Sequence, residues 1–171
     1  MSAKDYSYLP KEHQQTLKDA ANKKAEFKKF LDKMGSKPPK NLDRLAQEAH
    51  EEVFEKVDCL SCANCCKTTS PIFRMVDIER LAKHLRLKPA DLISKHLHID
   101  GDGDYVLNSS PCLFLGADNY CSVYEARPNA CREYPHTDRK NFHQITKLTL
   151  TNSQMCPATA KVVALLMERI K

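Results

Sequence analysis

Four cysteines lie within eight residues of this chain, and four more follow further along it. The eight thiols are those of Cys59, Cys62, Cys65, Cys66, Cys112, Cys121, Cys131 and Cys156. Thiolate sulfur is a preferred ligand of zinc, of iron in iron–sulfur clusters and of copper. The cysteine pattern therefore predicts a metal-binding chain. Nothing else in the sequence assembles into a recognisable catalytic apparatus, so the residues themselves do not indicate an enzyme.

Eight cysteines could also form four disulfides, as they do in small secreted domains. Residues 1–10 carry Lys4 and Asp5 but no apolar segment, so we expect no secretory signal. No later stretch is long and apolar enough to cross a bilayer, so we expect a cytoplasmic chain without membrane contact. A reducing compartment disfavours disulfides, and the adjacent residues Cys65 and Cys66 would be hard to place in a disulfide framework. Metal ligation is therefore the favoured interpretation.

The spacing of the first four cysteines indicates how they could divide between metal ions. A Cys-x2-Cys turn lets two sulfurs reach one ion at about 2.3 Å, and a third cysteine three residues later can join them. Cys59, Cys62 and Cys65 fit this pattern. Cys66 is expected to serve a second centre, because adjacent side chains diverge from the backbone. The eight thiolates could thus form two four-thiolate sites or one polynuclear site, and the spacing leaves both open.

The identity of the metal is also open. Cys59, Cys62 and Cys65, together with Cys156 before Pro157, have the spacing of the bacterial ferredoxin run, which favours an iron–sulfur cluster. In ferredoxins the cysteine before proline lies close to the other three, whereas here it is distant in sequence. Structural zinc readily recruits cysteines from distant loops. Copper is a further possibility on the softness of an all-thiolate site.

Some polar residues are expected to surround the ligands. A tetrathiolate zinc centre carries a formal charge of about −2, so cations or N–H donors should lie nearby. Lys67, Arg127 and Arg132 stand near candidate ligands in the sequence, and Arg132 is the first choice because it directly follows Cys131. His136 is the histidine best placed to be a ligand or a donor to one. The histidines on or beside amphipathic helices are expected at the surface.

Two amphipathic helices are expected before the cysteine cluster. Apolar residues recur at three- and four-residue spacing over residues 10–34, and Gly35 would end this helix. Asn41 can cap a second helix over residues 41–57, so that the two form a hairpin. Its lysine-rich outer face is expected to be solvated, although these helices could also dock a protein partner.

The later segments predict short helices and strands. Asp77 precedes an apolar helical stripe over residues 78–85, Pro89 opens a short helix through Leu97, and Pro157 opens the last helix. Strand-like pieces are expected at Tyr105–Leu107, Cys112–Leu115, Tyr120–Tyr124 and Ile145–Leu150. The expected fold class is mainly α with a small irregular β portion. We expect metal bonds to hold in place the cysteine-bearing loops that a hydrophobic core does not fix.

These elements divide the chain into an N-terminal helical hairpin extension, residues 1–58, and a cysteine-cluster metal-binding domain, residues 59–171. The length of 171 residues can bury a core, and four glycines with no tryptophan favour helices over a turn-rich sandwich. The net charge of +5 is spread out, since residues 1–58 hold 12 Lys and Arg against 11 acidic residues. No concentrated basic face stands out, so nucleic acid is not expected as a partner.

Several motifs together carry a family resemblance. They are the Cys-x2-Cys-x2-Cys-Cys run at 59–66, the helix motif at 77–82, the segments 111–115 and 121–135, and Cys156 with Pro157. On these motifs the chain resembles the YkgJ-type cysteine-cluster family, which is described as a zinc- or iron-chelating domain, and all eight cysteines fall on family positions. One departure is Ala63, where many members carry glycine. A turn without positive φ would tolerate alanine there and keep every ligand.

The resemblance implies a small metal-binding domain that holds zinc or iron through these cysteines. A related cysteine cluster occurs in flagellin lysine methylases, so one alternative is an iron–sulfur protein with redox or S-adenosylmethionine-dependent methyltransferase-like activity. The chain lacks the Cys-x3-Cys-x2-Cys spacing of radical S-adenosylmethionine enzymes and has no glycine-rich nucleotide loop. A zinc-stabilised protein-interaction module is the other alternative, and its fold should depend on the metal.

Overall fold

The computed structural model describes residues 6–170, so Lys4 and Asp5 of the expected signal-free N-terminus lie outside the described residues. This part of the chain is mainly helical with a two-stranded antiparallel sheet, which confirms the expected fold class. It divides into two compact units. We call residues 6–62 and 135–170 the helical unit and residues 63–134 the cysteine unit. Over residues 6–170, the helices are too short or too polar to cross a membrane.

The helical unit is discontinuous in sequence, because the cysteine unit is inserted between residues 62 and 135. Its elements are α1 (Lys11–Asn22), α2 (Lys24–Ser36), α3 (Leu42–Phe54), α4 (Cys59–Cys62), the 3-10 helix η2 (Phe142–Ile145), α9 (Thr146–Ser153) and α10 (Pro157–Arg169). The single helix expected over residues 10–34 is wrong, because α1 and α2 are separated at Lys23, where ψ is 11°. Asn22, a poor helix former, precedes the break.

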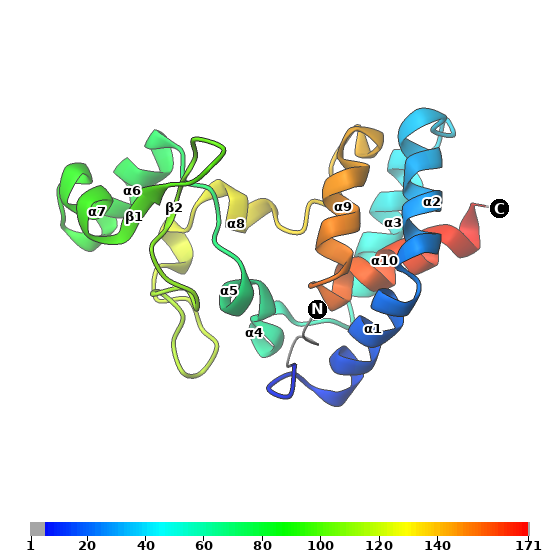
Figure 1. The fold of residues 1–171 in the computed structure, drawn as a ribbon, viewed down its shortest axis with the longest axis horizontal. Coiled ribbons are helices and arrows are strands. Elements are labelled where there is room, and N and C mark those ends of the chain that lie inside the picture. The colour runs from blue at the N-terminus through cyan, green and yellow to red at the C-terminus, as the bar shows by residue number, and fades with distance from the viewer. Residues whose placement is uncertain (1–5, 171) are drawn as a thin grey trace. The chain divides into compact units, whose positions relative to one another are not determined.

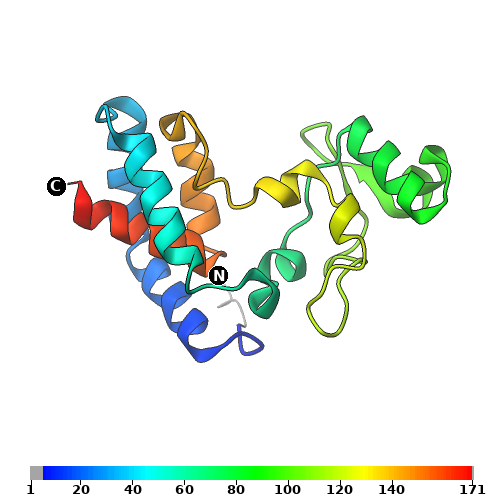
Figure 2. The same ribbon diagram turned by 180° about the vertical axis from the view of Figure 1, so that it is seen from behind.

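The helices of this unit are joined by one apolar core. Helix α10 packs on α3 and α1, and α2 packs on α9 (Figures 1 and 2). The largest fully buried apolar side chains come from both ends of the chain, namely Leu31, Met34, Phe142, Val162, Val163 and Leu166. The N-terminal helices therefore find their main partners in the C-terminal segment, a pairing that amphipathic patterns alone do not specify.

The strand expected at Ile145–Leu150 is wrong, because α9 covers most of this segment. Its β-branched residues favour strands in isolation. Here, however, Ile145 and Thr149 are buried at four-residue spacing, and the Thr149 hydroxyl donates to the Ile145 carbonyl at 3.0 Å. The contact with α2 is close at Gly35, where a β-carbon would lie 2.8 Å from Thr146 Oγ1. Packing on a neighbouring helix thus overrides local preference.

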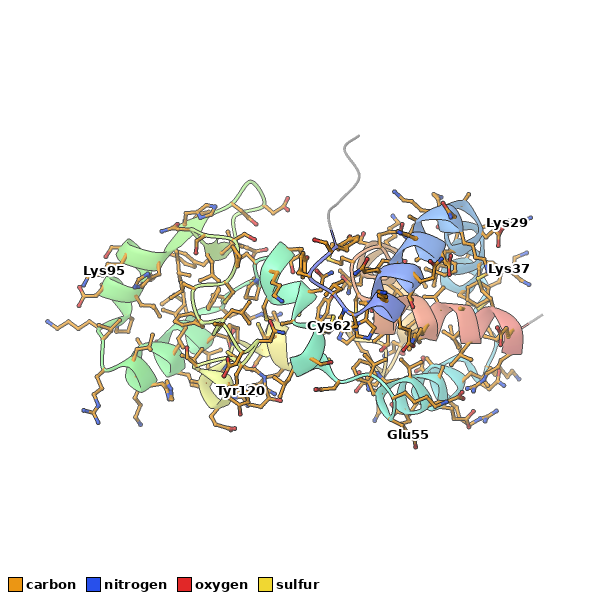
Figure 3. The ribbon with its side chains drawn as sticks, turned by 90° about the horizontal axis from the view of Figure 1, so that it is seen from below. Lys29, Lys37, Glu55, Cys62, Lys95 and Tyr120 are labelled. Atoms are coloured by element: carbon orange, nitrogen blue, oxygen red, sulfur yellow. The ribbon has the colours of Figure 1, made fainter. Side chains whose placement is uncertain are left out.

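The lysine-rich surface expected on the N-terminal helices is present. Lys29 lies on α2 and Lys37 directly follows it, and both side chains are exposed. In Figure 3 both lie at the outer edge of the helical unit. Lys28 pairs with Asp32 one turn later at 2.5 Å, which is an exposed contact of small energetic value.

The cysteine unit consists of shorter elements. They are α5 (Asn64–Thr68), α6 (Met75–Leu85), α7 (Pro89–His96), β1 (Leu97–Ile99), β2 (Tyr105–Leu107), the 3-10 helix η1 (Tyr124–Ala126) and α8 (Asn129–Glu133). Strands β1 and β2 pair antiparallel with Leu97 opposite Leu107. The expected strand at Tyr105–Leu107 is thus confirmed, whereas Leu97 begins a strand and does not continue the preceding helix.

Two other expected strands of this unit do not form. The segments Cys112–Leu115 and Tyr120–Tyr124 make only a single bridge, between Leu115 and Cys121. They instead form an irregular loop against a second apolar core. The buried members of this core are Phe73, Ile78, Leu81, Ala82, Leu92, Leu97, Leu107, Phe114, Val123 and Ala126. Cys112 and Cys121 are half-buried against it, so the apolar core directly supports two candidate ligands.

The two units and the two expected domains divide the chain at different places. The expected boundary lies between residues 58 and 59, whereas compact packing groups residues 59–62 and 135–170 with the N-terminal helices. The packing shows which segments share a core. That residues 1–58 form a separate extension of a cysteine domain stays a prediction.

Candidate metal centre

A tight backbone turn separates the first two cysteines from the next two. Asp58 caps α4, since its carboxylate accepts the N–H groups of Leu60 at 2.9 Å and of Ser61 at 3.2 Å. Ala63 then adopts a left-handed conformation, with φ of 47° and ψ of 20°, before α5 begins. The expectation of a turn without positive φ at Ala63 is therefore wrong. Glycine is the favoured residue in this conformation, and alanine adopts it at a cost.

Cys65 and Cys66 stand side by side in α5. Their sulfur atoms are 3.9 Å apart. The hydrogen bond from Cys65, followed by the charge of Lys67, lowers the pKa of the Cys66 thiol to about 7, against the opposing effect of burial. Sequence reasoning assigned Cys65 only to another metal ion and missed this hydrogen bond, although the adjacency of the two residues was visible. Cys66 is thus partly ionised at neutral pH, the form that binds metals.

The backbone brings Cys112 and Cys121 towards Cys66. The Cys112 N–H donates to the Cys66 carbonyl at 2.8 Å. After Cys112 the chain reverses through residues 116–120, and the bridge between Leu115 and Cys121 closes this turn. At Gly116 a β-carbon would lie only 2.6 Å from Asp118 Oδ1 and 3.3 Å from the Tyr120 carbonyl oxygen, so a side chain there would have to displace the Asp118 carboxylate.

The fourth thiol of the cysteine unit is carried by a short helix. Cys131 lies in the middle of α8, and its N–H donates to the Pro128 carbonyl at 3.0 Å. Burial, and then the negative charges of Cys66, Cys112 and Cys121, raise the pKa of the Cys131 thiol to about 12. Charges act strongly on a partly buried group only at short range. The direction of this shift therefore indicates that Cys131 lies within range of the charges of the other three thiols.

Cys112 and Cys121 show the same mutual effect. Burial raises the pKa of the Cys112 thiol, and the charges of Cys66 and Cys121 raise it further, against hydrogen bonds from backbone N–H groups. Burial likewise raises the pKa of Cys121, as does the charge of Cys66. Four of the eight expected ligands, Cys66, Cys112, Cys121 and Cys131, thus lie within range of one another's charge. We call these four residues the thiol cluster.

The other cysteines have separate surroundings. Cys59 is exposed, whereas Cys62 is 8% exposed and packs in a small apolar cluster with Leu9 and Leu17 of the helical unit (Figure 3). The Cys156 sulfur accepts the Thr159 N–H at 3.5 Å and so caps α10. The joint ligation of one ion by Cys59, Cys62 and Cys65 stays a prediction.

The cations expected around the ligands lie in different positions. Arg127 lowers the pKa of Cys121 and Cys131, and its guanidinium stacks 3.6 Å from the centre of the Tyr124 ring. Arg132 is exposed, and its guanidinium donates to the carbonyls of Glu125 and Arg127. By position, Arg127 is thus a stronger candidate than Arg132 for balancing thiolate charge. His136 belongs to the helical unit and has a left-handed φ of 66°.

Over residues 6–170, no three side chains of His, Cys, Asp or Glu are arranged so that they could hold a metal ion together. The donor chemistry of the thiol cluster nevertheless suits zinc or iron, since both metals take four cysteine ligands in proteins.

Comparison with known proteins gives one match. A family model described as "CxxCxxCC: Putative zinc- or iron-chelating domain" matches residues 58–157. This range contains all eight cysteines and begins at the Asp58 cap of α4. Searches of the curated proteins and of the solved structures gave no match.

Proposed function

Because the matching model covers more than half of the chain, this protein belongs to the CxxCxxCC family of zinc- or iron-chelating domains, and we propose that it binds zinc or iron through the thiol cluster. The observation that carries this proposal is the family match over residues 58–157, and the effect of four half-buried thiols on one another's pKa within one compact unit supports it. We further propose that the protein works in the cytoplasm, where a reducing environment keeps these thiols available.

The residues around the cluster suit its ionised form. A metal ion binds cysteine as thiolate, so four thiols must lose their protons on binding. The pKa of the Cys66 thiol is lowered to about 7, in part by the charge of Lys67. The charge of Arg127 favours the thiolate forms of Cys121 and Cys131. Bound zinc would supply a structural cross-link between α5, the loop of residues 108–128 and α8. The separate stability of these short elements is small, so this cross-link would contribute directly to folding.

An iron–sulfur centre is the second candidate, because a set of four cysteines also suits such clusters. An iron–sulfur cluster would supply electron-transfer chemistry, and the protein could then have redox or S-adenosylmethionine-dependent activity. If the bound metal is zinc, the alternative function is a protein-interaction module that zinc stabilises.

Elemental analysis of the full chain, purified without air and without added metal, tests the proposal. We expect zinc or iron at one or more ions per chain, and Cys131→Ser should lower the content by about one site. Zinc with a featureless visible spectrum would support the structural version. Iron with acid-labile sulfide and broad absorption near ~400 nm would support the iron–sulfur version.

Ala130→Ser is the matched control, because it adds a hydroxyl group beside Cys131 and removes no thiol. We expect its metal content to equal that of the unaltered protein. Unchanged metal content in both Cys131→Ser and Cys121→Ser would contradict the proposed ligands. A protein that contains no metal and takes up neither Zn²⁺ nor iron would contradict the proposed function.

A further inference from the structure

The most deeply buried charge of the cysteine unit does not belong to a thiol. Asp77 of α6 is only 1% exposed, and its carboxylate is satisfied from three directions. Oδ1 accepts from Arg80 Nη2 at 2.5 Å and from the Asn129 N–H at 3.0 Å, and Oδ2 accepts the Arg74 N–H at 3.2 Å. Burying a carboxylate is costly unless it is paired and hydrogen-bonded, as it is here.

One of these bonds replaces a missing helix cap. Helix α8 begins at Asn129 after Pro128, and a proline side chain has no oxygen that could accept an N–H group. Asp77 supplies this acceptor from another element, and its negative charge lies at the positive end of α8. A helix of five residues is unstable by itself, so its position depends on such contacts. This helix carries Cys131 of the thiol cluster.

Arg80 fastens the segment that leads into α8. Its Nη2 donates to the Arg127 carbonyl at 2.9 Å and to the Asn129 side-chain oxygen at 3.4 Å, and its Nε donates to the Ala126 carbonyl at 3.4 Å. These residues lie between Cys121 and Cys131 in the sequence. The pair formed by Asp77 and Arg80 therefore holds the chain between two candidate ligands.

The energetics favour a positioning role over a contribution to stability. Buried ion pairs add little net stability, because the cost of removing two charges from water offsets their attraction. Their hydrogen-bond geometry, in contrast, restricts the partners to one arrangement. We propose that Asp77 and Arg80 are positioning residues that hold Cys131 in place for metal binding, an inference that rests on the proposed function of the thiol cluster.

The test measures Zn²⁺ affinity of the full chain by competition with a chromophoric chelator. Asp77→Asn should weaken Zn²⁺ binding by about 10- to 100-fold, the usual effect of changing a residue that orients a metal ligand. Asp91→Asn is the matched control, since Asp91 also stands in the first turn of a helix of this unit, α7, and forms no side-chain bond among those described. Its affinity should stay within about twofold of the unaltered protein.

A double-substitution cycle separates positioning from general destabilisation. In a Cys131→Ser background, Asp77→Asn should lower Zn²⁺ affinity by no more than about threefold, because the ligand that it positions is gone. An equal loss in both backgrounds would overturn the inference. Zn²⁺ affinity unchanged by Asp77→Asn would overturn it as well, and would leave the proposed function intact.

Arg80→Lys provides the test if Asp77→Asn does not fold, as judged by circular dichroism of the protein with Zn²⁺ added. Lysine keeps the charge beside Asp77 but loses the fork of donors to residues 126–129. We expect Zn²⁺ to bind about 3- to 10-fold more weakly, with full helicity. Normal affinity in Arg80→Lys would then overturn the inference. If the unaltered protein does not bind Zn²⁺ or iron, the proposed function and this inference both fail.

Discussion

The two units of this chain differ in the interactions that stabilise them. The helical unit uses helices of up to 13 residues around a continuous aliphatic and aromatic core, and Phe142 at its centre is completely buried. The cysteine unit has helices of at most 11 residues among its elements, and an irregular loop that carries two thiols. A buried ion pair and the thiol cluster supply cross-links there. We infer that apolar burial suffices for the stability of the first unit, whereas the second depends in addition on metal contacts.

Metal removal should have the largest effect, because it should unfold the cysteine unit and leave the helical unit folded. We expect a strong chelator to expose the amides of α6, α7 and β1 to hydrogen exchange while α3 and α10 stay protected. Structural zinc contributes about 10–16 kcal/mol in small zinc domains, which is as large as the whole stability of a typical domain, about 5–15 kcal/mol. Hydrogen exchange followed by mass spectrometry measures both units in one experiment. Equal loss of protection in the two units would contradict the comparison.

The pH dependence of metal binding should be steep. At pH 7 a Cys66 thiol with a pKa of about 7 is half ionised. Burial raises the pKa of the Cys112 and Cys121 thiols, and it raises the pKa of the Cys131 thiol to about 12. Binding as four thiolates would therefore release about 3.5 protons, and Zn²⁺ affinity should fall by about three to four decades per pH unit below 7.

Competition titrations at several pH values measure this slope. Because protons compete with the metal ion for every thiolate, lowering the pH can only weaken binding at these residues. Cys131→Ser should reduce the slope by about one proton. A slope of one or less in the unaltered protein would mean that the thiol cluster does not bind the ion.

Phenylalanine-to-alanine substitutions in the two apolar cores should show which core supports metal binding. Phe142→Ala in the helical unit should cost about 3–5 kcal/mol of unfolding free energy without changing the metal content. Phe114→Ala should cost a similar amount and also weaken Zn²⁺ binding, because Phe114 lies in the core that supports Cys112 and Cys121. Denaturant unfolding and chelator competition measure the two effects. Weakened Zn²⁺ binding in Phe142→Ala would contradict the independence of the two cores.

The smallest effect is expected at the turn before α5. Ala63→Gly should stabilise the cysteine unit by about 1 kcal/mol, because glycine adopts positive φ without strain. Ala130→Gly within α8 is the matched control and should destabilise by about 0.5–1 kcal/mol. Hydrogen exchange of the zinc-loaded protein gives both values. A destabilising Ala63→Gly would show that the left-handed turn is not a source of strain.

The features that could be predicted from the sequence are those determined by residues close together in the chain. Helices α3, α6, α7 and α10 follow from apolar periodicity and from proline or polar residues at their starts, and their boundaries agree within a few residues. The family of the cysteine region also follows from its motif. The assignment of Cys66 to a metal centre other than that of Cys65 stays a prediction, and the two sulfur atoms lie 3.9 Å apart.

Features that depend on distant partners could not be predicted in this way. Asp77 was interpreted as the start of a helix, yet its carboxylate also serves Asn129, which lies 52 residues later. Its one visible signal is the three-residue spacing to Arg80, which is common on helix surfaces. The helical form of residues 146–153 depends on α2, and the left-handed turn at Ala63 has no local signal because alanine seldom adopts it.

The insertion of the cysteine unit into the helical unit has a consequence for the entropy of the chain. Both ends of the insert are attached to the helical unit, so residues 63–134 close a loop. The entropic cost of closing a flexible loop grows only with the logarithm of its length, at about 0.6 kcal/mol per doubling. A disordered segment 63–134 would therefore reduce the stability of the helical unit by only slightly more than a loop of half its length. Under the proposed function, residues 63–134 would fold and unfold as metal binds and dissociates, while the helical unit stays folded.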